Sequence, residues 1–423
     1  QLVLKDPYSL YPIKTAAEVS EINGLSVSHP TNIGEEYKVY VNDIEAPTKI
    51  IGYRNGDRWF NADGSELKSA EFLANQTSNG RIAPYLVNPN KLELTKDALE
   101  DFTPALNLLP RIWFSFPLEP ERKSFYVSYD VLAQRPNSGA SFLTIDELYY
   151  LKNRQGATIS NGSLQPRIKT DYEVGYKQIF GVKKDRGLEI AASYSENRKD
   201  FGLYQISQGY PVTYTTYRNI DFSTITGFRG TFSMNDIGGV GAIPGPFSFV
   251  ASYMLQFADG TGSNISSQAA LIASNQPNLR NVIPLGELDI RHNIKLMATW
   301  AYGGGIDPRT KKNMYLGPKI NGKEIFKYAS FNIISNSYSG TPYTPTVRPV
   351  QVGAVDRAQI KGVPFGARLP WQQTFDINIT KGVRFNRADN GKPLVMSVFF
   401  WIQNVMNARN VNSVYPFTGE AMN

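Results

Sequence analysis

The sequence contains no cysteine and only two histidines, His29 and His292, in 423 residues. Without cysteine, the chain can form neither a disulfide framework nor a thiolate metal site, and redox chemistry does not identify its compartment. Two histidines so far apart leave no Ser-His-Asp set to test and little material for a histidine metal site. We therefore expect no enzyme activity, no metal and no cofactor.

Long apolar segments are also absent, because no run of apolar residues approaches the roughly 20 that a transmembrane helix requires. The mean hydropathy of -0.31 is too polar for a bundle of membrane helices. The net charge of +7 is spread along the chain without a basic run, so we expect no nucleic-acid partner. No secretory signal follows Gln1, and we expect a processed or partial chain that lacks its N-terminal part.

What the sequence does contain is a repeated two-residue alternation. Between Asp171 and Lys177, aromatic and aliphatic residues occupy the even positions, and charged residues or glycine occupy the odd positions. This pattern predicts a strand with one apolar and one polar face. Ten segments of this kind are predicted to be long strands: 108–118, 123–133, 168–180, 187–206, 215–234, 246–258, 291–303, 325–339, 371–384 and 393–405.

Long two-faced strands favour an all-β fold, a transmembrane antiparallel β-barrel with long extracellular loops. Closure of a barrel leaves no backbone group unpaired in lipid. Connection lengths agree, because 119–122 and 181–186 are short whereas 134–167 and 259–290 are long, and the connection 304–324 is an exception to this alternation. A soluble sandwich or propeller would also show alternation, but its strands are typically about 5 to 6 residues long.

Residues 1–107 show no comparable series of strands. They contain hairpin signals at Asn55-Gly56 and Asp63-Gly64. We interpret 1–107 as an extracellular loop insertion with hairpins, and 108–423 as the C-terminal part of the barrel. Five aromatic residues of the predicted loops are candidates for stacking on a ligand, or else they pack the loops together: Tyr53, Trp59, Phe60, Tyr210 and Tyr214.

Several short motifs carry a family resemblance. They are LQP at 164–166 with DYEVGY at 171–176, IRHN at 290–293, SGTPY at 339–343 and WIQNVMN at 401–407. In this order they resemble the late barrel strands of TonB-dependent outer-membrane receptors. The stretch YDVLAQRP at 129–136 is similar to the Bacteroidetes branch of that family.

The resemblance implies a barrel of about 22 strands, of which this chain supplies about ten and lacks the last. It implies the outer membrane of a Gram-negative bacterium and uptake of a large or scarce nutrient, whether small molecule, glycan or peptide. TonB would energise uptake through a missing N-terminal part, and a surface lipoprotein and outer-membrane lipid are further partners. The alternatives are a passive pore or scaffold subunit of a larger outer-membrane complex, or a soluble carbohydrate-binding β protein.

The same resemblance places a plug inside the barrel. Charged residues of the polar strand faces would then contact that plug or line a substrate path, and we favour plug contact because so wide a lumen is normally filled. The residues predicted to face the lumen or plug are Asp171, Glu173, Lys177, Lys295 and Asp376.

Overall fold

The computed structural model describes most of the chain. Its described residues are 2–4, 6–77, 80–90, 93–101, 104, 106–153, 157–206, 213–236, 239–240, 243–244, 246–261, 282–286, 288–303, 315, 317–349, 360–385 and 394–422. None of the helices in this described part is long and apolar enough to cross a membrane.

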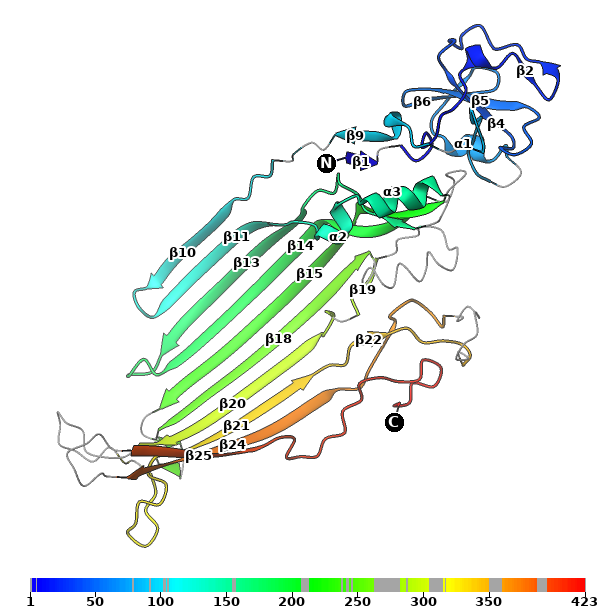
Figure 1. Ribbon diagram of the computed structural model, residues 1–423. Helices are drawn as coiled ribbons and strands as arrows, with labels where there is room; N and C mark the ends of the chain where they lie inside the picture. Colours follow the sequence, from blue (N-terminus) through cyan, green and yellow to red (C-terminus); the bar gives the residue numbers. More distant parts are fainter. Residues whose placement is uncertain are drawn as a thin grey trace.

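One large antiparallel sheet dominates the described residues, and its main strands are hydrogen-bonded in the order β10-β11-β13-β14-β15-β18-β20-β21-β24-β25. These strands lie side by side in a single layer (Figure 1). They are β10 Arg111–Glu119, β11 Lys123–Gln134, β13 Arg167–Phe180, β14 Arg186–Ile206, β15 Tyr214–Asp236, β18 Phe247–Thr261, β20 His292–Tyr302, β21 Ala329–Tyr338, β24 Gln372–Phe385 and β25 Leu394–Ile402. The predicted all-β fold and all ten long strands are confirmed.

Short elements complete the described structure. β12 Thr158–Ile159 and β19 Val282–Pro284 join the large sheet beside β15 and β18. The helices α2 Ser138–Ser141 and α3 Ile145–Lys152 precede β13, and a capping box of Thr144 and Glu147 begins α3. Three of the two-stranded pairs are β2 Glu21–Ile22 with β3 Leu25–Ser26, β16 Gly239–Val240 with β17 Ile243–Pro244, and β22 Pro342–Tyr343 with β23 Ala367–Arg368.

The strand register sorts side chains onto two faces that run across the whole sheet. One cross-strand row is polar through eight strands: Ser124, Lys177, Glu189, Thr231, Ser252, Lys295, Asn336 and Thr374. A row on the opposite face consists of Phe247, Trp300, Phe331, Ile379 and Phe400. We call these the polar face and the apolar face. The alternation read from the sequence is therefore aligned from strand to strand.

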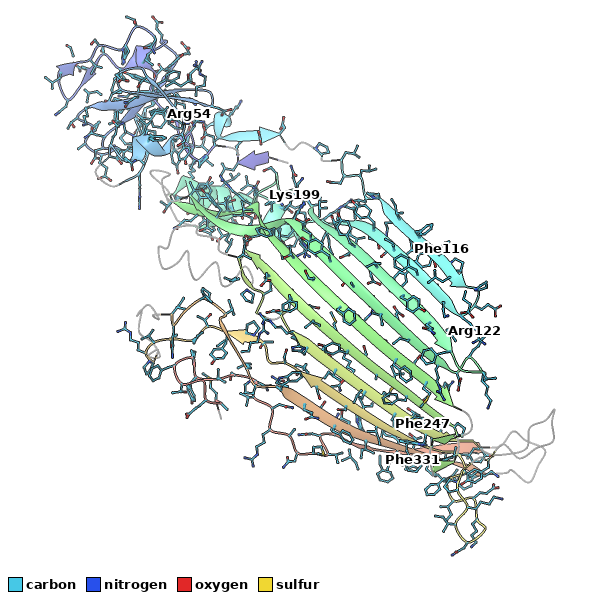
Figure 2. All side chains as sticks on the ribbon, turned by 180° about the vertical axis from the view of Figure 1, so that it is seen from behind. Arg54, Phe116, Arg122, Lys199, Phe247 and Phe331 are labelled. Carbon is cyan, nitrogen blue, oxygen red and sulfur yellow. The ribbon has the colours of Figure 1, made fainter. Side chains whose placement is uncertain are left out.

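Aromatic side chains concentrate at both ends of the apolar face. At one end the rings of Tyr129, Tyr172 and Tyr194 follow one another at centroid distances of 5.1 and 6.2 Å. At the other end Phe247 contacts Trp300 at 4.6 Å. Figure 2 places Phe247 and Phe331 together at this end and Lys199 at the opposite end. The apolar face thus carries two aromatic belts.

The N-terminal residues form a separate small unit at the tyrosine end of the strands (Figure 1). Its sheet has the order β7-β6-β5-β4-β8. The elements are β1 Leu2–Leu4, η1 Ala16–Glu18, β4 Lys38–Val41, β5 Ile50–Asn55, β6 Arg58–Asn61, β7 Glu66–Leu67, α1 Glu71–Ala74, β8 Ala83–Pro84, η2 Lys96–Ala98 and β9 Leu99–Asp101. β1 pairs with β9, so the first and last segments of the unit lie side by side.

The buried apolar clusters of the described residues belong to this unit and to its contact with the large sheet. Two clusters fill the unit itself around Tyr40 and Tyr53. A third joins Tyr11 of the unit to Leu151 of α3 and to Ile206 at the end of β14. Among the residues that the structure describes, no such cluster lies in the middle of the large sheet, and Leu296 on its apolar face is 38% exposed. The hydrophobic core therefore lies at one end of the strands.

Candidate functional site

The five charged residues predicted to face a lumen all lie on the polar face. Lys177 and Lys295 share one cross-strand row, and Asp171 and Glu173 follow on alternate positions of β13. Asp376 occupies the same face of β24, where its carboxylate accepts a hydrogen bond from the Asn404 N–H at 2.7 Å. The register brings all five to one surface, and their contact with a plug stays a prediction.

A compact ionic cluster covers part of this face. The Tyr126 hydroxyl donates to Glu173 Oε1 at 2.7 Å, and Arg229 Nη2 lies 3.3 Å from Glu173 and 3.1 Å from Glu189. The Tyr126 ring lies over Gly175, where a Cβ atom would approach the ring to 2.3 Å. Tyr126 is therefore an aromatic residue on the polar face, where its ring packs on Gly175 and its hydroxyl donates a hydrogen bond to a carboxylate. This explains why it interrupts the alternation in the sequence.

The predicted ligand-stacking aromatics pack on protein atoms instead. Tyr53, Trp59 and Phe60 are 1%, 6% and 5% exposed, and they fill the N-terminal unit. Tyr214 belongs to the cluster between this unit and the large sheet. Tyr210 lies outside the described residues. The four of these aromatic residues that the structure describes pack against other protein side chains. Stacking of any of them on a ligand stays a prediction.

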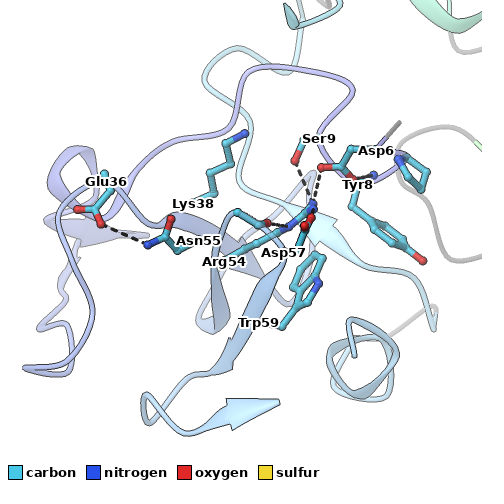
Figure 3. Close-up of a pocket in the computed structure, with 11 residues that line it drawn as sticks. Asp6, Tyr8, Ser9, Glu36, Lys38, Arg54, Asn55, Asp57 and Trp59 are labelled. Atoms are coloured by element: carbon cyan, nitrogen blue, oxygen red, sulfur yellow. Dashed lines mark hydrogen bonds and ion pairs between the residues drawn. The ribbon is translucent and has the colours of Figure 1, made fainter. Parts of the chain in front are cut away.

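A cavity of the N-terminal unit lies beside one of these aromatics, Trp59. It has a volume of about 510 Å³, in the range of small-molecule sites. The segment before β4 forms one wall, and the β5–β6 hairpin forms the other (Figure 3). The hairpin signal predicted from Asn55-Gly56 is confirmed, but its two turn residues are Gly56 and Asp57. Gly56 has a φ of 56°, which glycine adopts without strain.

Arg54 is the centre of this cavity wall. Its Nη1 lies 2.6 Å from Asp6 Oδ2 and 3.2 Å from Ser9 Oγ, and its Nε donates to the Gly56 carbonyl at 2.7 Å. The guanidinium also stacks over the Trp59 ring at 4.5 Å. These contacts fix a charged group that is largely buried, which is costly unless it is paired. Figure 3 shows the converging partners.

Sequence patterns did not reveal Arg54 as a site residue. An arginine inside an amphipathic strand normally points to solvent. Its partner Asp6 is 48 positions away in the chain, so no local spacing connects them. The one signal in the sequence was a charged residue, Arg54, inside the mainly apolar segment that forms β5.

Tyr40 is buried close to Arg54, and its hydroxyl group leads us to expect a loss of stability at alkaline pH. Burial raises the pKa of Tyr40 to about 12, from an ordinary value of 10.0. The folded state holds this proton more tightly, so its stabilising effect is complete below pH 10 and is lost as the pH rises to 12. Two pKa units correspond to about 3 kcal/mol of unfolding free energy.

We expect the wild-type chain to lose about that much more unfolding free energy between pH 10 and 12 than Tyr40→Phe. Urea unfolding followed by tryptophan fluorescence at several pH values measures the difference. The same comparison between about pH 7 and 9, below the ordinary tyrosine pKa, serves as the control and should give equal losses for the two proteins. Equal alkaline losses in wild type and Tyr40→Phe would contradict the prediction.

Two of the motifs that carry the family resemblance, IRHN and SGTPY, meet around one buried carboxylate. Asp289, beside IRHN, is 1% exposed and forms an ion pair with Arg368. The same guanidinium donates to the carbonyls of Asp289 and of Gly340, in SGTPY. His292 stacks on Trp371 at 5.6 Å and hydrogen-bonds the Tyr253 hydroxyl at 3.0 Å. These weak sequence signals mark one cluster of contacts between loops.

No group of three or more histidine or carboxylate side chains in the described part of the chain is arranged to hold a metal ion. No protein-family model and no curated protein sequence matches the chain.

Comparison with solved structures finds similar chains at low identity. They include the outer membrane transporter YddB from Escherichia coli, at 10% identity and TM-score 0.49, covering 72% of this chain and 38% of that one. The FrpB iron transporter from Neisseria meningitidis has 11% identity and TM-score 0.37, with coverage of 65% and 32%. The copper transporter OprC has 12% identity and TM-score 0.35, with coverage of 72% and 34%. The chain thus spans less than two fifths of the length of each of these proteins.

Proposed function

We propose that the chain forms part of an outer-membrane barrel in a receptor that takes up a large or scarce nutrient. The two-faced sheet is the observation that supports this most directly. Its apolar face stays exposed along the strands, whereas soluble monomers rarely expose apolar patches beyond several hundred Å². Tyr172 and Phe180 of β13 lie eight positions apart on this face, which is about 27 Å along the strand. Barrel proteins carry an apolar band of about 25 Å between aromatic girdles.

The two free edges support closure into a larger barrel. β10 and β25 each pair on one side only among the described strands. Unpaired backbone groups cost several kcal/mol each in lipid, so further strands would have to complete the ring of about 22. In that barrel the polar face lines the interior, and the cluster of Tyr126, Glu173 and Arg229 contacts the plug.

Connection lengths set the proposed orientation. β10–β11 and β13–β14 are joined by short turns at one end. The N-terminal unit and the long connections 135–166, 262–291 and 339–371 lie at the other end, and the connection 303–328 is an exception at the end of the short turns. Outer-membrane barrels place short turns in the periplasm and long loops outside the cell. The N-terminal unit would then be an external recognition unit that can meet nutrient and a surface lipoprotein. TonB would act from the periplasmic side.

Fractionation and uptake measurements test this proposal. We expect the tagged protein in the outer-membrane fraction of its Gram-negative host, extractable only with detergent. Mass spectrometry of spent medium compares wild-type cells with cells lacking this protein and with cells lacking TonB. Compounds that wild-type cells consume and that cells lacking this protein leave in the medium should also be left by cells lacking TonB. Uptake that persists without TonB would favour the passive pore, and protein in the soluble fraction would contradict a barrel.

A further inference from the structure

We propose that the cavity beside Arg54 binds the amino-terminal end of a short peptide. This assignment rests on the proposed function, because it treats the N-terminal unit as the part that meets nutrient outside the cell. The cavity is large enough for a few residues of an extended chain. Its charges and covered aromatic faces select the ligand class.

The charged side chains that line the cavity have a negative balance. Three carboxylates, of Asp6, Glu36 and Asp57, and two cations, of Lys38 and Arg54, line it, which leaves one net negative charge. Asp6 and Arg54 neutralise each other at 2.6 Å. The Asp57 carboxylate is 88% exposed and lies 3.9 Å from Arg54. An ammonium group is therefore favoured here, and phosphate, sulfate or an acidic glycan is disfavoured.

The aromatic geometry disfavours a neutral sugar. Sugars are commonly held against an open aromatic face, but Arg54 covers the Trp59 ring at 4.5 Å and Tyr40 packs against it at 4.9 Å. Tyr8 contacts the same indole edge-on at 5.7 Å. What remains is an apolar wall of ring edges beside polar groups. Such a wall suits a small aliphatic side chain next to a charged terminus.

A peptide amino terminus satisfies both features. Its ammonium group would pair with the exposed Asp57 carboxylate in the β5–β6 turn, and Glu36 would add negative charge to the same cavity. The following peptide carbonyl would accept from the Asn55 side-chain amide, which lies between Glu36 and the hairpin turn (Figure 3). Because Arg54 is already fixed by Asp6, Ser9 and Gly56, this wall needs little reorganisation on binding.

Calorimetry on the full chain in detergent tests the assignment. The probes are unblocked tetra-alanine, N-acetyl tetra-alanine and maltotetraose. We expect tetra-alanine to bind, and acetylation to weaken binding about tenfold or more, the loss expected when a charge-assisted hydrogen bond is removed. Maltotetraose should not bind. The comparison of acetylated and free peptide uses only wild-type protein, so it does not depend on the folding of any variant.

Substitutions locate the binding site. Asp57→Asn should also weaken tetra-alanine binding about tenfold. Glu45→Gln, at an exposed carboxylate of the same unit outside the cavity, should leave it unchanged. Equal binding of free and acetylated peptide, preferential binding of maltotetraose, or absence of peptide binding would overturn the assignment. The location of the protein is measured in a separate experiment. If the peptide does not bind but the protein is in the outer membrane, only the peptide assignment is wrong. If the protein is in the soluble fraction, the proposed function is wrong whatever the peptide result.

Discussion

Leu296→Arg should sharply reduce the amount of assembled protein in the outer membrane. Leu296 lies on the apolar face of β20, midway between His292 near one aromatic belt and Trp300 in the other. Arginine at the lipid-facing midplane of a barrel costs about 2 to 4 kcal/mol. The loss should appear as less protein in outer-membrane fractions and as a lower unfolding free energy in urea titrations of reconstituted protein.

Met297→Arg is the matched control, because this residue follows directly in the same strand and points to the polar face. Met297 is 43% exposed and Leu296 is 38% exposed, so the two substitutions differ mainly in the face that they charge. We expect Met297→Arg to change the unfolding free energy by less than about 1 kcal/mol. Equal effects of the two substitutions would show that the face opposite the polar row does not meet lipid.

Arg368→Gln should destabilise the loop cluster at the tyrosine end of the sheet. The substitution leaves the Asp289 carboxylate buried without its main ionic partner, since Arg291 lies 3.9 Å away. Breaking a buried ion pair by removing one partner costs about 3 to 5 kcal/mol. Urea unfolding of the variant measures this loss, and hydrogen exchange should show faster opening around Asp289 and Gly340.

Two further variants separate the pair from a general effect of charge. Arg409→Gln removes an exposed arginine of the same region and should be nearly neutral. Combining Arg368→Gln with Asp289→Asn removes the uncompensated charge, so the double variant should be more stable than Arg368→Gln alone. If the double variant is less stable than the single one, the ion pair is not the source of the effect.

The long strands were predictable because alternation is a local property. The two faces of a strand can be recognised from a few consecutive residues, as between Asp171 and Lys177. The hydrogen-bonding register then places like faces of neighbouring strands on the same side of the sheet. The ends were less accurate. β10 begins at Arg111 where 108 was predicted, and β21 begins at Ala329 where 325 was predicted. A strand begins where its neighbour offers hydrogen-bonding partners, which a single segment does not reveal.

The candidate sites were predicted unevenly. Asp171, Glu173 and Lys177 were placed on the polar face because their position follows from period-two alternation. The loop aromatics were left open between ligand contact and packing, and Tyr53 and Trp59 are buried. Composition marks an aromatic residue as available for packing or for binding, and only the surrounding structure distinguishes the two uses.

The sequence by itself determined the all-β class, the ten long strands and the two chemically distinct faces, because backbone geometry sends successive side chains to opposite sides. Tertiary structure alone decided which distant residues meet. Asp6 reaches Arg54, Asp289 reaches Arg368, and Tyr126 covers Gly175 between two carboxylates. Such contacts depend on register and on how loops return across the sheet, and these are set by the packing of the whole chain and not by any local pattern.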